Sequence, residues 1–189
     1  MLAIVPVKGL EGAKARLAPL LAADERAALV QRMLTDVLAA CEASGAVTRA
    51  LVVTPQPAVA PAGVDVLVDE GEGHAAAVAL ALADGRAAAG ALVVMADCPL
   101  ATPAALARLA AAARPVALAP ARDGGLNALA LLDPTAFEPV FGVPRAAELT
   151  AARARAAGLE PAVVAEPTLA HDVDSPADLR ALPQLEACA

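Results

Sequence analysis

The distribution of hydrophobic residues along the chain predicts strands and helices in alternation. Short apolar runs have the length and composition of buried strands, and the expected strands are 2–6, 50–54, 64–68, 90–95, 116–120, 128–132 and 161–164. The run 90–95 is apolar without alternation, which is typical of a central parallel strand covered on both faces.

Between these runs, hydrophobic residues recur at helical spacing. The longest helix is expected to open at Asp24 and Glu25, and its apolar face includes Leu29 and Met33 before the chain reaches Gly45. Further helices are expected over 75–82, from Thr102-Pro103 to about 113, over 145–157, and after Ser175. The alternation predicts a single α/β domain over residues 1–189 with a three-layer, mostly parallel sheet, in which ligands bind beyond the carboxyl ends of the strands.

Composition narrows the class of protein. Hydrophobic residues make up 59% of the chain but aromatic residues only 1%, so we expect a core of Leu, Val and Ala. A net charge of -7 and a pI near 4.8 argue against nucleic acid and anionic membranes as partners. Cys41, Cys98 and Cys188 are too far apart for a zinc or disulfide motif. The sequence shows no signal peptide or membrane span, so we expect a cytoplasmic protein. The sequence leaves the oligomeric state open, and a homodimer is one alternative.

Three carboxylates follow segments that would end at the ligand edge of the sheet. Asp97 comes directly after the uncharged run 90–96, while Asp172 and Asp174 are two residues apart, so that both side chains would point to one side of an extended segment. Carboxylate oxygens are the ligands that Mg²⁺ prefers, and a magnesium site is therefore predicted. The alternatives are a turn carboxylate at Asp97 and support for the Ser175 helix cap by Asp174.

Cations follow the first expected strand. Lys8, Lys14 and Arg16 lie in a turn-like stretch in which Gly9 and Gly12 would let the backbone approach a polyphosphate. The alternative is that they are ordinary surface charges. Neither the Walker motif nor the Gly-x-Gly-x-x-Gly pattern is present, so a P-loop enzyme or a standard dinucleotide fold is not indicated.

Other polar residues sit where a ligand could reach them. His74 opens a helix, where exposed N–H groups could meet the polar edge of a ligand, although a plain loop histidine is an equal alternative. Asn127 follows the turn 123–125 and could offer its amide to a ligand, or it could simply belong to the turn. Arg145 is either a surface charge or a clamp for a phosphate or carboxylate.

Taken together, these motifs resemble the 2-phospho-L-lactate guanylyltransferase family, which builds the phosphodiester of coenzyme F-420. The similarity extends over nearly the whole chain and is carried by the segments 4–8, 14–19, 96–100 and 172–179. It implies a nucleotidyltransferase fold of the glycosyltransferase-A type. It also implies transfer of GMP from GTP to a small phosphorylated carboxylic acid, of the 2-phospholactate, phosphoenolpyruvate or 3-phosphoglycerate type, with release of pyrophosphate.

The resemblance also implies roles for the residues above. Lys8, Lys14 and Arg16 would contact the GTP phosphates, to which we add His74 for nucleotide binding. Lys14, Arg16 and Asp97 would be catalytic, and Mg²⁺ would be held by Asp97, Asp172 and Asp174.

The acceptor loops depart from the family pattern. Gly125-Leu126-Asn127 stands where the family has Gly-Thr-Asn, and Gly142 to Arg145 stands where it has Gly-Pro-x-Ser. We assign acceptor binding to these five named residues and predict that Arg145 replaces lost hydroxyls by gripping a carboxylate or phosphate. The family's Leu-Asn is also absent from 75–78. Another base, another acceptor, or a binding module without turnover therefore remain alternatives.

Overall fold

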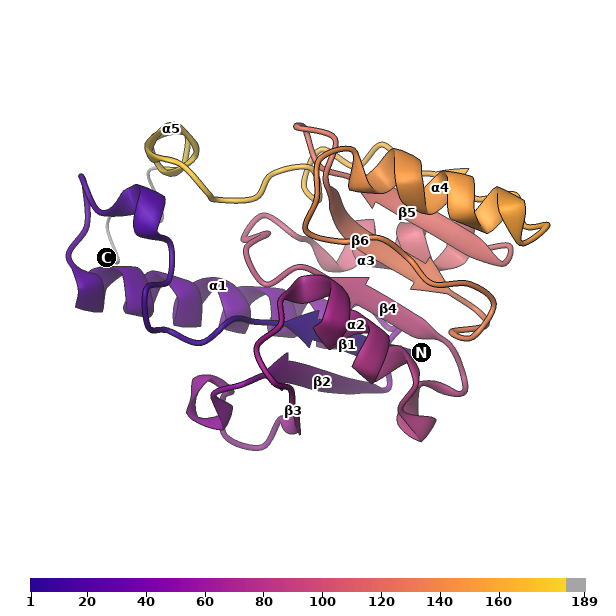
Figure 1. Cartoon of the computed structure of the whole chain (residues 1–189), viewed down its shortest axis with the longest axis horizontal. Coiled ribbons are helices and arrows are strands. Elements are labelled where there is room, and N and C mark those ends of the chain that lie inside the picture. Colours follow the sequence, from indigo (N-terminus) through magenta and orange to yellow (C-terminus); the bar gives the residue numbers. More distant parts are fainter. Residues whose placement is uncertain (183–189) are drawn as a thin grey trace.

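The computed structural model describes residues 1–182 and contains one seven-stranded sheet (Figure 1). The strand order is β3-β2-β1-β4-β6-β5-β7. β6 runs antiparallel to its neighbours β4 and β5, while every other strand pair is parallel. The prediction of a mostly parallel sheet is confirmed. The strands are β1 (Leu2–Pro6), β2 (Arg49–Thr54), β3 (Asp65–Val68), β4 (Ala91–Val94), β5 (Val116–Pro120), β6 (Leu126–Leu131) and β7 (Ala162–Val163).

Helices cover both faces of this sheet. They are α1 (Ala23–Ala43), α2 (His74–Leu82), α3 (Pro103–Ala112), α4 (Ala146–Ala156) and α5 (Pro176–Arg180), with short 3-10 turns at Ala15–Leu17, Pro57–Val59 and Gly85–Ala87. Figure 1 shows α2 and α4 in front of the sheet and α1 and α3 behind it, and α1 contacts α3 directly. The three-layer α/β architecture predicted from the alternation is therefore confirmed.

The helix starts follow the expected capping chemistry. The Thr102 hydroxyl accepts a hydrogen bond from the backbone N–H of Ala105 at 3.2 Å, and proline follows at the first helical position. At α5, Ser175 and Asp178 form a reciprocal capping box, in which the Asp178 carboxylate accepts from the Ser175 backbone at 2.8 Å. This bond fixes the segment that carries Asp174.

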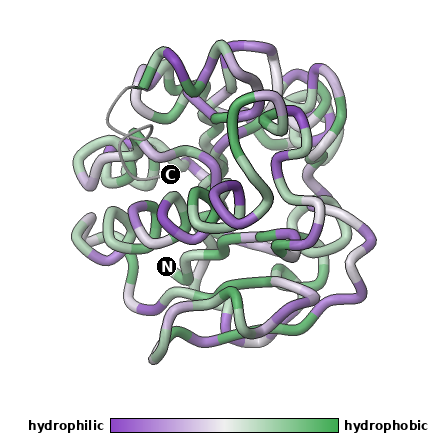
Figure 2. Tube along the Cα trace, turned by 90° about the vertical axis from the view of Figure 1, so that its left-hand side faces the viewer, coloured by the Kyte–Doolittle hydropathy of each residue, from purple (hydrophilic) through white to green (hydrophobic). Residues whose placement is uncertain are grey.

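The core consists mainly of Leu, Val and Ala side chains, as the composition predicts. Ile4, Leu51 and Leu92 lie on neighbouring central strands and are fully buried. The helical turns in Figure 2 alternate between hydrophobic and hydrophilic positions, as expected of helices that pack one face on a sheet. In the part of the chain that the structure describes, no helix is long and apolar enough to cross a membrane.

The sixth strand differs from the expected one and brings residues to the ligand edge. It begins at Leu126 rather than 128, because the turn after β5 is tight: the N–H of Ala121 bonds the Gly125 carbonyl at 3.0 Å. The turn reverses the chain, so the start of β6 lies beside the carboxyl end of β4. Leu126 and Asn127 therefore reach the same edge as Asp97.

Candidate active site

A cavity of about 690 Å³ opens at the carboxyl ends of β1 and β4, where an α/β sheet is expected to bind ligands. Almost all of the predicted site residues line it. They are Lys8, Lys14, Arg16, His74, Asp97, Gly125, Leu126, Asn127, Gly142, Asp172 and Asp174. Arg145 is absent from this lining.

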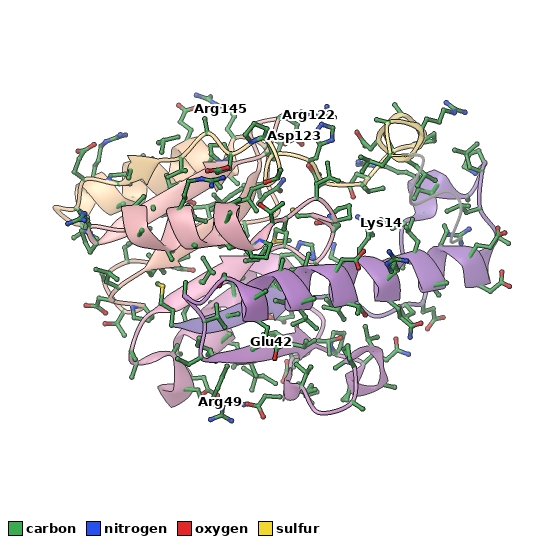
Figure 3. All side chains as sticks on the ribbon, turned by 180° about the vertical axis from the view of Figure 1, so that it is seen from behind. Lys14, Glu42, Arg49, Arg122, Asp123 and Arg145 are labelled. Carbon is green, nitrogen blue, oxygen red and sulfur yellow. The ribbon has the colours of Figure 1, made fainter. Side chains whose placement is uncertain are left out.

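Lys14 is the electrostatic centre of the cavity. Its Nζ lies 2.7 Å from Asp97 Oδ2 and 2.6 Å from Asp174 Oδ1, and only 12% of its side chain is exposed. Figure 3 shows Lys14 reaching toward the sheet from the loop beside α1. One ammonium thus joins three segments that are far apart in the sequence, and it forms ion pairs with two carboxylates.

The charges around Lys14 act on one another. Burial on its own lowers the pKa of the Lys14 ammonium, but the charges and hydrogen bonds of Asp97 and Asp174 outweigh burial and raise the pKa above its ordinary value. Burial likewise tends to raise the pKa of Asp174, yet Lys14 and then Arg16 hold it below its ordinary value. Lys14 and Asp174 are therefore both charged at neutral pH.

Asp172 has a different partner. Its Oδ1 accepts a hydrogen bond from Asn127 Nδ2 at 3.3 Å, and burial raises the pKa of its carboxyl group in spite of that bond. The backbone N–H of Val173 bonds the Asp97 carbonyl at 3.1 Å, so the C-terminal segment is attached to the end of β4 between the two carboxylates. The structure thus brings the three predicted metal ligands to one cavity.

The first loop, which follows β1 at residues 8–16, lines the cavity with backbone atoms as well as with cationic side chains. Gln56 Oε1 accepts a hydrogen bond from Leu10 N at 2.9 Å, and a Cβ atom at Gly9 would stand 3.0 Å from the same oxygen. A Cβ atom at Gly9 would therefore press on the Gln56 side chain that accepts this hydrogen bond. Lys8 is exposed, and Arg16 is 79% exposed with its guanidinium 3.9 Å from Asp174. Both are free to turn toward an anion in the cavity.

His74 begins α2 on the opposite wall. Burial lowers the pKa of its imidazole, and Lys8 and Lys14 lower it further against the opposing effect of Asp97, so the ring is neutral at neutral pH. Gly142 lies beside it, because a Cβ atom there would be 4.0 Å from that of His74. The loop before α4 and the start of α2 therefore form one side of the cavity together.

The wall that was predicted to bind the acceptor is apolar rather than basic. Leu126, Val143 and Pro144 line the cavity, and Leu126 is buried. Arg145 instead pairs with Glu148, with Nε 2.8 Å from Oε2, and its side chain is 72% exposed. Its backbone, at φ 60°, is left-handed, and Figure 3 shows its side chain far from Lys14. The predicted clamp is therefore not formed in this conformation.

The carboxylates suit a small, hard cation. Asp97 and Asp174 already share one positive charge, and their oxygens are the donors that Mg²⁺ prefers. Within residues 1–182, however, no three His, Cys, Asp or Glu side chains are grouped closely enough to hold a metal as they stand. Lys14 lies where a cation shared by Asp97 and Asp174 would bind.

Sequence reasoning missed two features of this site. The first is the Lys14 ion pairs, whose partners lie 83 and 160 positions away and therefore leave no local pattern. The second is Asp123, which was interpreted as part of a turn. It does form that turn, accepting from Gly125 N at 2.8 Å, but it also lines the cavity.

Comparisons with known proteins agree with this geometry. The family described as "Guanylyl transferase CofC like" matches residues 1–183. The chain is 40% identical over 190 residues to a phosphoenolpyruvate guanylyltransferase of Sphaerobacter thermophilus, covering 96% of this chain and 91% of the relative. It is 41% identical over 169 residues to a 2-phospho-L-lactate guanylyltransferase of Halobacterium salinarum, covering 88% of this chain and 77% of the relative.

Solved structures with a similar fold include nucleotidyltransferases. A nucleotidyl transferase from Methanothermobacter superposes with a TM-score of 0.68 at 17% identity, covering 100% of this chain and 98% of its own. The 2-C-methyl-D-erythritol 4-phosphate cytidylyltransferase of Thermus thermophilus gives a TM-score of 0.62 at 19% identity, covering 97% of this chain and 98% of its own. The predicted nucleotidyltransferase fold is confirmed.

Proposed function

The chain belongs to the family of CofC-like guanylyl transferases, and we propose that it transfers GMP from GTP to a small phosphorylated carboxylic acid with release of pyrophosphate. The observation that carries the proposal is the cavity in which three cations of one loop meet three carboxylates from two other segments. The names of the phosphoenolpyruvate and 2-phospho-L-lactate relatives support the acceptor class.

The reaction needs little proton transfer. A phosphate oxygen of the acceptor attacks the α-phosphorus of GTP, a new P–O–P linkage forms, and the bond from the α-phosphorus to the bridging oxygen of pyrophosphate breaks. A phosphate monoester is already anionic at neutral pH, so no general base has to activate it. Catalysis then consists of positioning the two anions and stabilising the developing charge.

The first loop is suited to hold the nucleotide phosphates. Lys8 and Arg16 are exposed cations at the mouth of the cavity, and Lys14 is the buried one. We propose that Lys14 leaves its carboxylates for a phosphate when the nucleotide binds, because a triphosphate also supplies charge-assisted acceptors and Mg²⁺ would then take the place of Lys14 beside Asp97 and Asp174. When bound by Asp97, Asp172 and Asp174, Mg²⁺ would neutralise the charge of the phosphates and orient them.

The acceptor end relies on other contacts. Among the cavity-lining residues within 1–182, no Lys or Arg comes from the second half of the chain. The anionic acceptor is therefore attracted mainly by the cations of the first loop and by backbone N–H groups near Gly142. The buried Leu126 excludes water on its side of the cavity, which strengthens the electrostatic interactions there.

Pyrophosphate release tests this proposal. Purified protein is incubated with GTP, Mg²⁺ and, separately, phosphoenolpyruvate, 2-phospho-L-lactate or 3-phosphoglycerate, and the same acceptors are tested with ATP, CTP and UTP. We expect release that requires both GTP and one of the acids. Release that is faster with CTP would contradict the choice of base, and tight GTP binding without release under any condition would indicate a binding module.

A further inference from the structure

Asn127 is buried at the start of β6, and its side-chain amide is bonded to the C-terminal segment instead of pointing freely into the cavity. Its side-chain nitrogen donates to the Leu169 carbonyl at 3.0 Å and to Asp172 Oδ1 at 3.3 Å, and its residue is 5% exposed. Its backbone carbonyl accepts from Met95 N at 2.9 Å. Asn127 therefore connects the central sheet to the segment that carries Asp172.

This arrangement uses the whole donor capacity of the side chain. An asparagine amide has two N–H donors, and both are directed at oxygen atoms of the segment 169–172. The remaining polar atom, Oδ1, can only accept hydrogen bonds. It would repel the phosphate or carboxylate of an anionic substrate, so the substrate contact expected from the sequence would require at least one of the two existing hydrogen bonds to break.

We infer that Asn127 is a positioning residue, which orients the Asp172 carboxylate toward a divalent cation, and that it does not bind the acceptor. The inference rests on the proposed function only in that a cation binds the three carboxylates. Asn127 fixes the segment from the β6 side, while the bond from Val173 N to the Asp97 carbonyl fixes it from the β4 side. Losing a partner of a metal ligand typically reduces metal affinity about 10- to 100-fold.

Binding of Mn²⁺, measured by electron paramagnetic resonance of the free ion, tests the inference without turnover. With GTP present, we expect Asn127→Ser to weaken Mn²⁺ binding about 10-fold. At saturating metal, the KM for phosphoenolpyruvate should change less than about twofold. Leu126→Thr is the matched control, since the neighbouring side chain lines the cavity without contacting a carboxylate, and it should change the acceptor KM with little effect on Mn²⁺.

A double-mutant cycle excludes a general loss of folding. If Asn127 acts through Asp172, then Asn127→Ala should weaken Mn²⁺ binding in the native background and should have no further effect in an Asp172→Ala background. Unchanged Mn²⁺ affinity together with a raised acceptor KM would overturn the inference and restore the acceptor role. Equal losses in both backgrounds would also overturn it. Because Mn²⁺ binding is measured without catalysis, a failure of the proposed reaction would be recognised separately, by the absence of pyrophosphate release from the unaltered protein.

Discussion

Replacing Lys14 by Met should change metal binding and nucleotide binding in opposite directions. In the absence of ligands, the Lys14 ammonium contacts both Asp97 and Asp174, within 2.7 Å of each. A divalent ion that binds both carboxylates must displace this charge. Methionine keeps most of the volume of the side chain but has no charge, so it frees the two carboxylates and removes one phosphate ligand.

The structure sets the scale of each effect. A hydrogen bond to a charged group contributes about 1.5–3 kcal/mol, and Asp174 is 47% exposed, so screening by solvent favours the lower end for its bond to Lys14. We therefore expect Lys14→Met to tighten Mn²⁺ binding in the absence of nucleotide about 10-fold, which is about 1.4 kcal/mol. The same change should weaken GTP binding about 10-fold or more, because a buried, charge-assisted phosphate contact is lost.

Titration calorimetry with Mn²⁺ alone, and with GTP at saturating Mn²⁺, measures both quantities. Arg16→Met is the matched control, because Arg16 is 79% exposed and lies 3.9 Å from Asp174, so the affinity for Mn²⁺ alone should change less than about threefold. If Lys14→Met weakened the binding of Mn²⁺ alone while the protein kept its native circular dichroism, the interpretation of Lys14 as a competing cation would be wrong.

Three further predictions concern catalysis, stability and thiol reactivity. Asp97→Asn should reduce pyrophosphate release about 100-fold or more with little change in melting temperature, since this carboxylate faces the cavity; near-normal release would remove it from the site. The Glu166 carboxyl has its pKa lowered mainly by the hydrogen bond from Arg108, so its contribution to stability is present above pH 4.5 and is lost as the pH falls through the lower, folded-state pKa. Glu166→Gln should therefore lower the melting temperature more at pH 7 than at pH 3, and an equal decrease at both values would contradict this. Burial raises the pKa of the Cys41 thiol to about 12 and that of Cys98 well above its ordinary value, so neither should react with Ellman's reagent at pH 8 until the protein unfolds; rapid labelling of either one in the native state would contradict their burial.

Much of the fold could be predicted because local patterns determine it. The strand at 2–6 and the helix after Thr102-Pro103 were predicted almost to the residue, since an apolar run defines the strand and the Thr102 hydroxyl marks the start of the helix. The direction of β6 could not be predicted in this way. A strand has the same pattern in either direction, and only the tight turn at 121–125 reverses the chain.

The sequence predicts which residues line the cavity, but it does not predict which of them bond to one another. Strand ends at one edge of a sheet bring their following residues together, which is why Asp97 and the first-loop cations line one cavity. The roles of Asn127 and Arg145 depend on partners instead. Asn127 bonds a carbonyl 42 residues away, and Arg145 begins α4 in a left-handed conformation that directs it toward Glu148. The Asn127 contact has no local signature in the sequence, whereas Arg145 and Glu148 have the i, i+3 spacing of a helical ion pair.

Phosphorus NMR of a reaction containing the protein, GTP, Mg²⁺ and phosphoenolpyruvate or 2-phospho-L-lactate tests the central claim most directly, because it identifies the bonds that form and break. Guanylyl transfer predicts a pair of coupled diphosphate signals from the new P–O–P linkage, and pyrophosphate in equal amount. Both should be lost with Asp97→Asn. If the unaltered protein instead released orthophosphate and GDP, or bound GTP and left it intact with every acid, the account of this cavity as a guanylyl transfer site would be contradicted.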